Sequence, residues 1–169
     1  AQSAPWAYAR FKAFNQLYMN IYDDDSLSMF YAIGLQDPFH KNRLNVLEAM
    51  NESLGYIAEL ELDASSLFSS EVLSMVQHLA INDSSYAVQA EALSVLVAVD
   101  ANAHRDFFAQ ALSSPSIAVT AMAMMAMVDI DLQTALKYAE REQNTQNFTM
   151  LDAVGMIYAE SGDIRYQDY

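Results

Sequence analysis

The residues of this chain that could do acid–base or metal chemistry are few and widely spaced. Its 169 residues include three histidines and no cysteine. The histidines are His40, His78 and His104; none is followed by a glutamate, and none has a second histidine four residues on. Zinc sites on helices need ligands paired at such spacings. The spacing favours structural or surface histidines, and the lack of cysteine excludes thiol catalysis, disulfides and Cys-ligated zinc.

An acidic run is the next candidate for chemistry. Asp23–Asp25 could begin a calcium loop, but the alternating oxygen ligands, the central glycine and the terminal glutamate of such loops are missing. A helix N-cap explains the run better, because carboxylates offset the exposed N–H groups and the dipole at a helix start. The sequence also has no G-x-S-x-G motif, no glycine-rich phosphate loop and no paired catalytic carboxylates. Residue by residue, nothing in it predicts an active site.

The strongest regularity is a helix–turn–helix pattern with a period of about 30 residues. Its turns begin at Asp37, Asp83 and Ser114, with a degenerate fourth copy at Asn144. The interval after Asp37 is longer by about half a period, which predicts an insertion over 54–68 that reads as a connector with room for a short helix. Two helices at this period are typical of stacked helical repeats, in which each unit buries its apolar face only against its neighbours.

Apolar residues recur at fixed positions of each copy. Because positions three or four apart lie on one helical face, the second helix of each copy carries an apolar stripe. Ten and thirteen residues after the turns, this stripe consists of Leu47, Met50, Leu93, Leu96, Met124, Met127, Val154 and Ile157. The corresponding positions before the turns hold Phe30, Leu35, Val76, Ile81, Phe107 and Leu112. Met122, Met124, Met125 and Met127 could also form a soft binding groove, but the register places Met124 and Met127 in the core.

These patterns predict an all-α protein, a HEAT-like α-α superhelix of stacked antiparallel helix pairs. We expect a single helical-repeat domain over 1–169, cut from a longer chain because the pattern stops without a polar cap. The first helix is expected over 5–22, and the repeats over about 24–53, 69–100, 101–130 and 131–161. Helices within them are expected near 27–36, 39–53, 71–82, 86–99, 103–113, 116–128, 131–143 and 146–160. Gly162 fits a helix C-terminus, and Tyr166 and Tyr169 are expected to stay unburied.

Arg43 is the most suggestive polar residue, since it lies six positions after Asp37. In HEAT-type repeats an Asp at the turn and an Arg at this offset commonly pair between neighbouring repeats. The same offset from the later turns holds Gln89, Thr120 and Met150. We therefore expect these pairs to be mostly lost, with Arg43 making one local contact. The predicted structural residues of the repeat turns are Asp37, Arg43, Asp83 and Ser114.

Composition limits the classes of partner. The chain carries 22 acidic and 8 basic residues, a formal net charge of −14, which disfavours nucleic acid and anionic membrane surfaces as partners. The acidity favours solubility, and an acidic face that steers cationic ligands is the alternative. The longest apolar stretch, 121–128, is far shorter than the ~20 residues of a membrane span. No signal-peptide pattern is present, and the compartment stays undetermined.

Three segments together resemble one particular family. They are DPFHKNRLNVLEAM, NDSSYAVQAEALSVL and IYAESGDIRYQDY, and their order and spacing resemble the C-terminal helical domain of zinc aminopeptidases of the aminopeptidase N family. The resemblance covers about residues 5–169. It implies a HEAT-like domain that follows a catalytic domain, packs against it, covers its active site and restricts access to peptides with free ends.

The catalytic motifs of that family, H-E-x-x-H with a downstream Glu and G-x-M-E-N, do not occur in this sequence. The resemblance therefore implies no catalytic, cofactor-binding or metal residue in this segment, and zinc in the catalytic domain of the parent enzyme. The implied partners are the catalytic domain of the same chain and, indirectly, peptide substrates. A stand-alone HEAT-like scaffold that binds a protein partner along its concave face is the alternative. Candidates for a groove or interdomain surface are Tyr86, Gln89 and Glu91.

Overall fold

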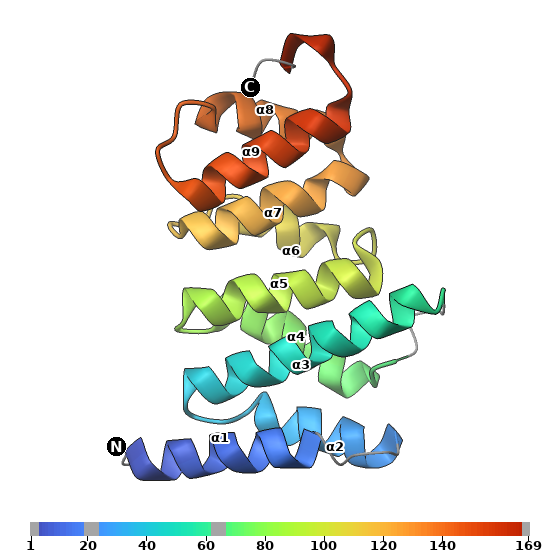
Figure 1. The fold of residues 1–169 in the computed structure, drawn as a ribbon, viewed down its shortest axis with the longest axis vertical. Coiled ribbons are helices and arrows are strands. Elements are labelled where there is room, and N and C mark those ends of the chain that lie inside the picture. Colours follow the sequence, from blue (N-terminus) through green and yellow to red (C-terminus); the bar gives the residue numbers. More distant parts are fainter. Residues whose placement is uncertain (1–3, 19–23, 62–66, 167–169) are drawn as a thin grey trace. The chain divides into compact units, whose positions relative to one another are not determined.

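All the regular secondary structure in the residues that the structure describes is helical. The computed structural model describes residues 4–18, 24–61 and 67–166 (Figure 1). These residues contain α-helices, one short 3₁₀ helix and no strand, which confirms the predicted all-α class. The bounds are α1 (Ala4–Tyr18), α2 (Asp24–Gly34), α3 (His40–Glu59), α4 (Ser70–Asn82), α5 (Tyr86–Asp100), α6 (Arg105–Ala111), α7 (Ile117–Ile130), α8 (Leu132–Glu142), α9 (Phe148–Ser161) and the 3₁₀ helix η2 (Ile164–Tyr166).

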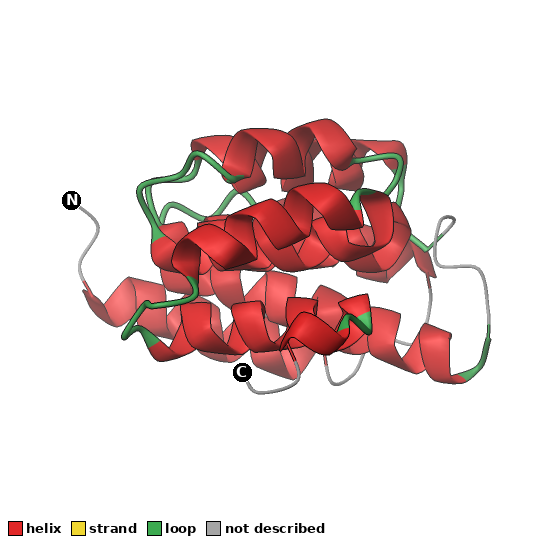
Figure 2. Ribbon diagram, turned by 90° about the horizontal axis from the view of Figure 1, so that it is seen from above, coloured by secondary structure: helices red, strands yellow, loops and turns green. Residues whose placement is uncertain are grey.

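The chain divides into two compact units, Ala1–Val99 and Asp100–Tyr169. The first contains α1 to α4 and all but the last residue of α5, and the second contains α6 to α9 and η2. Within each unit the loops and turns lie at the ends of the helices (Figure 2). One domain over 1–169 stays a prediction.

In each unit, helices pack both against the next helix along the chain and against the helix after that. In the first unit, α1, α3 and α5 run in the same direction (Figure 1). There α2 packs against α1, α3 and α4, and α1 packs against α3. In the second unit, α7 packs against α6, α8 and α9, and α8 also packs against α9. Alternate helices thus lie side by side in both units, α1 with α3, α2 with α4, and α7 with α9.

The predicted apolar stripe is buried in both units. Seven of its residues have 0 % exposure, namely Leu47, Met50, Leu93, Leu96, Met124, Val154 and Ile157, and Met127 has 4 %. The core interpretation of Met124 and Met127 is therefore confirmed. Two expected positions before the turns differ, since Ile81 and Phe107 are only half-buried. The inward face of α6 instead passes through Phe108, which has no exposed surface.

The third helix is longer than predicted. α3 continues to Glu59, through the first residues of the insertion expected over 54–68. Leu54 explains the extension, because it continues the buried face of Leu47 and Met50 and is 3 % exposed. The expected helix end at residue 53 is therefore wrong, because residues 54–59 continue α3 and form no separate short helix. Residues 62–66 of the insertion lie outside the described residues.

Local capping chemistry sets several helix starts. Ser69, Asp131 and Asn147 each accept a hydrogen bond from a backbone N–H three residues on, at the starts of α4, α8 and α9. The cap expected from the side chains of Asp23–Asp25 lies outside the described part of the chain, as do residues 19–22 of the first expected helix.

The end of α9 is more ordered than the sequence suggested. Gly162 adopts φ +61° and ends the helix, as predicted. Tyr166 then folds back: its ring stacks on that of Tyr158 at 4.0 Å between centroids, and its hydroxyl donates to Glu140 at 2.5 Å. Tyr166 is half-buried, so the expectation that it stays unburied is wrong. Tyr169 lies outside the described residues.

We expect Gly34→Ala to destabilise the protein by about 1–3 kcal/mol. Gly34 ends α2 against α3, and an added Cβ would lie 2.4 Å from Cγ2 of Val46. Val46 is fully buried and stiff at χ1, so it cannot turn away without strain. Denaturant unfolding followed by circular dichroism would measure the change.

Gly155→Ala in α9 is the matched control. Nothing lies within 4 Å of an added Cβ there, so this substitution should stabilise the helix by about 0.5–1 kcal/mol. Equal changes in the two variants would contradict the close contact at Gly34.

Candidate functional site

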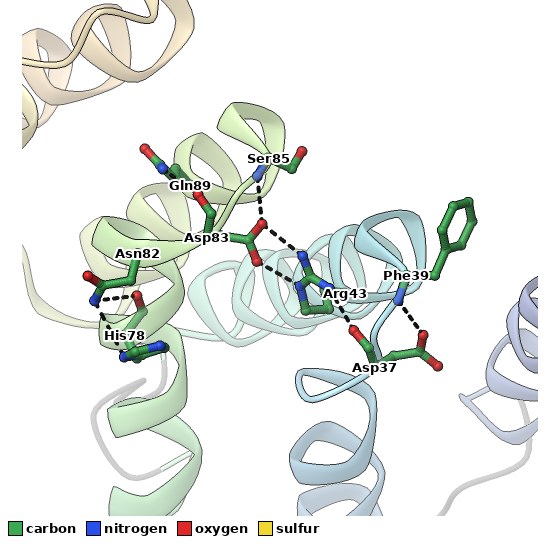
Figure 3. Close-up of polar contacts among 8 residues, drawn as sticks. All are labelled: Asp37, Phe39, Arg43, His78, Asn82, Asp83, Ser85 and Gln89. Carbon is green, nitrogen blue, oxygen red and sulfur yellow. Dashed lines mark hydrogen bonds and ion pairs between the residues drawn. The ribbon is translucent and has the colours of Figure 1, made fainter. Parts of the chain in front are cut away.

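The turn between α2 and α3 is built from polar contacts to Asp37. Its carboxylate Oδ1 accepts the backbone N–H of Phe39 at 2.8 Å. Its backbone oxygen accepts Nη1 of Arg43 at 2.6 Å (Figure 3). Arg43 lies in the second turn of α3, from which its long side chain folds back over the start of the helix. One aspartate and one arginine thus satisfy backbone groups on both sides of the turn.

The next two turns repeat these contacts with other side chains. Oδ1 of Asp83 accepts the backbone N–H two residues on at 2.8 Å, and Gln89 donates to the backbone oxygen of Asp83 at 2.6 Å. At Ser114, the hydroxyl accepts the N–H two residues on at 3.2 Å, and Thr120 donates to the backbone oxygen at 3.1 Å. The residue six positions after the turn therefore serves the same local purpose in the first three copies.

Two ion pairs each join a helix of the first unit to a turn further along the chain. Arg43 binds both carboxylate oxygens of Asp83, with Nε and Nη2 at 2.7 and 2.8 Å (Figure 3). Arg10 of α1 binds Asp37 in the same way, at 2.5 and 3.1 Å. The side chains of Asp37 and Asp83 are 3 % and 2 % exposed. Two-pronged guanidinium–carboxylate pairs have the strongest geometry for holding two elements together.

These contacts extend the expectation for Arg43, which makes an ion pair with Asp83 as well as the expected local contact. At the later turns the same offset holds Gln89 and Thr120, which make the local contact. Sequence reasoning also missed Arg10. Its signal is a shared spacing, because Pro5, an aromatic residue and Arg10 recur as Pro38, an aromatic residue and Arg43.

The pKa of Asp37 lies below its usual range. Burial raises this pKa, but hydrogen bonds from Arg10, the amide of Phe39 and Asn42 lower it by more. The pKa of Arg10 is raised for the complementary reason, mainly its hydrogen bond to Asp37. Asp37 is therefore held as a carboxylate at neutral pH, bound to a guanidinium, and is unsuited to act as a general acid or base.

We expect Asp37 to make stability depend on pH in the acid range. Because its folded pKa is lowered, its contribution is complete above its unfolded value of about 3.9 and is lost as pH falls through the folded value. Asp37→Asn should therefore be less stable than wild type at pH 7, and the difference should shrink below about pH 4. Urea unfolding at stepped pH values would measure it, with the exposed Asp129→Asn as control. A difference that stays constant down to pH 2 would contradict the ion pair.

The three candidates for a groove surface do not gather into one site. Tyr86 is 49 % exposed at the start of α5, whereas Gln89 is engaged in the turn at Asp83. Glu91 faces α3, where it accepts a hydrogen bond from Asn51 at 2.6 Å. Glu91 also lies near an acidic group on α3: burial raises the pKa of Glu48, and the charges of Glu91 and Glu52 raise it further. Steering of cationic ligands by such carboxylates stays a prediction.

The histidines have separate surroundings. His40 contacts the ring of Phe39, and His78 lies beside Asn82. His104 is buried, which lowers its pKa, and the charge of Asp100 partly opposes that shift. Within residues 4–18, 24–61 and 67–166, no three His, Cys, Asp or Glu side chains lie together as a metal site. None of the described helices is both long and apolar enough to cross a bilayer.

Hollows on the surface are shallow and open. One, of about 950 Å³, lies along α9 and η2. A second, about 360 Å³, lies between α2 and α4 and is lined partly by Leu35, Met75 and Leu79. A third, about 310 Å³, lies beside Ser114 and Thr120 and includes Arg141 and Glu142. Each is lined by side chains suited to packing or surface contact.

The fold and the turn contacts define a class, an all-helical protein in whose first unit two Arg–Asp ion pairs link helices to turns. No family model matches the sequence, and no curated protein matches it significantly.

Proposed function

We propose that the chain is a HEAT-like α-α superhelix of stacked antiparallel helix pairs, and that it serves as the non-catalytic C-terminal helical domain of a zinc-dependent aminopeptidase of the aminopeptidase N family. The supporting observation is that the segments that carry the resemblance also build the turn contacts. DPFHKNR supplies Asp37 and Arg43, and NDSSYAVQ supplies Asp83 and Gln89. The third segment, IYAESGDIRY, contains the Gly162 cap and the stacked tyrosines.

In this role the domain packs against the catalytic part and limits which peptides reach it. Zinc and the residues that polarise the peptide bond belong to the catalytic domain, and this chain supplies a stiff wall. Ion pairs between turns support that stiffness, because they oppose the sliding of one helix pair past the next. The net charge of −14 would attract the cationic amino terminus of a peptide substrate.

The first test is the intact mass of the native gene product, with zinc measured on the same sample. A product several times heavier than 18.9 kDa that carries about one zinc per chain is the expected result. A metal-free product near 18.9 kDa would refute the aminopeptidase assignment and favour a stand-alone scaffold, for which partner capture is the next step. Zinc binding or aminoacyl hydrolysis by residues 1–169 alone would refute the division of roles.

A further inference from the structure

One apolar face of α9 lies open to solvent. Leu151, Gly155, Met156 and Ala159 line the hollow of about 950 Å³, with Gly162 and Tyr166 at its far end. Positions 151, 155 and 159 are four apart and lie on one side of the helix. Met156 is 56 % exposed, and Phe148 at the start of α9 is 82 % exposed. We call the surface formed by Leu151, Gly155, Met156, Ala159 and Tyr166 the α9 face.

The repeat register shows that two of these positions are covered on the preceding second helix. Leu151 and Met156 correspond to Ala121 and Ala126 of α7, counted from the turns at Asn144 and Ser114. Ala121 and Ala126 are 0 % and 3 % exposed, and α9 packs against α7. At these two positions α9 carries larger apolar side chains than α7, and in the described part of the chain they line an open hollow beside η2.

From this continuity we propose that the α9 face binds an amphipathic helix of a partner protein, one with an apolar stripe flanked by Lys and Arg. Charge selects the partner. The exposed Asp152 borders the hollow, and the chain as a whole carries a formal net charge of −14. Asp163, also at the border, is paired with Arg165. A second copy of the same chain would be repelled by that charge, whereas a basic helix would be attracted.

Three features of the α9 face suit a bound helix. Nothing lies within 4 Å of an added Cβ at Gly155, so a large apolar side chain of the partner can approach the α9 backbone there. Met156 has a flexible, polarisable side chain that adapts to a partner's surface. The stacked rings of Tyr158 and Tyr166 form a rigid end to the hollow. Helices that dock in this way use apolar residues at i, i+3, i+4 and i+7.

A designed peptide tests the proposal on the 169-residue chain. The probe is a helix of about 18 residues made of Leu, Lys and Ala, with the leucines on one face. We expect calorimetry to detect binding of this probe to the wild-type chain. Gly155→Arg should weaken the binding about tenfold or more, because the arginine fills the hollow and carries the same positive charge as the lysines of the probe. Gly55→Arg is the control, because an added Cβ at this α3 position also meets nothing within 4 Å, and it should leave binding unchanged. Circular dichroism of both variants checks that they fold.

Each remaining outcome overturns the proposal. A control peptide has the same composition but its leucines are shuffled, so that it has no apolar stripe. If it bound equally well, the binding would come from charge alone and not from the apolar α9 face. Self-association that Gly155→Arg abolishes would assign the α9 face to a second copy. No binding, or equal weakening by Gly55→Arg, would leave no role for this face. A native-length product that fails to bind the probe, while the 169-residue chain binds it, would show that its own chain covers the face.

Discussion

Arg43→Ala should lower the free energy of unfolding of the first unit by about 3–5 kcal/mol, the cost typical of removing one partner of a buried ion pair. The side chains of Arg43 and Asp83 are 11 % and 2 % exposed, so the variant would leave a carboxylate in the protein interior with little access to water. It would also remove the donor to the backbone oxygen of Asp37. Denaturant unfolding would measure the loss, and hydrogen exchange should locate it in α3 and α5.

Arg141→Ala is the matched control for this experiment. Arg141 pairs with Glu142 at 3.0 Å, but the two side chains are 62 % and 30 % exposed, and such surface pairs contribute about 0–1 kcal/mol. Arg43→Lys should fall between the two, because lysine keeps the charge and loses the two-pronged geometry. If Arg43→Ala were no more destabilising than Arg141→Ala, the ion pairs between turns could not be what stiffens the proposed wall.

Met124→Ala is the second large effect, an expected loss of about 2–5 kcal/mol in the second unit. Met124 has no exposed surface, and its truncation would leave a cavity in the face that α7 turns inward. Hydrogen exchange should then accelerate in α7.

The control is Met156→Ala on the exposed side of α9, where the residue is 56 % exposed. We expect that change to stay within about 0.5 kcal/mol. Similar losses in the two variants would contradict the assignment of Met124 to the core.

The helices and most of the core could be predicted from the sequence. The stripe that includes Leu47, Leu93 and Met124 followed from a period set by helix geometry. Caps such as Ser69 and Gly162 depend on residues within a few positions, so they are also readable locally. The length of α3 was missed because we ended it at residue 53, although Leu54 continues its buried face.

The polar contacts of the turns could be predicted only in part. An Asp and an Arg at a fixed offset indicated a turn at Asp37, and the local bond from Arg43 was expected. Its second partner, Asp83, lies 40 residues away. The sequence analysis looked for arginines only six residues after each turn. It therefore found Arg43 but not its ion pair with Asp83, and it did not consider Arg10, which precedes the first of these turns.

The sequence by itself determined the class of fold, the turn positions, the buried stripe and the absence of familiar catalytic motifs, because each depends on residues close together in the chain. Only the tertiary structure decided that Arg10 and Arg43 pair across turns, that Tyr166 stacks on Tyr158, and that one face of α9 stays open. These features depend on which helices come to lie side by side. That outcome is set by the packing of whole faces, and no local pattern encodes it.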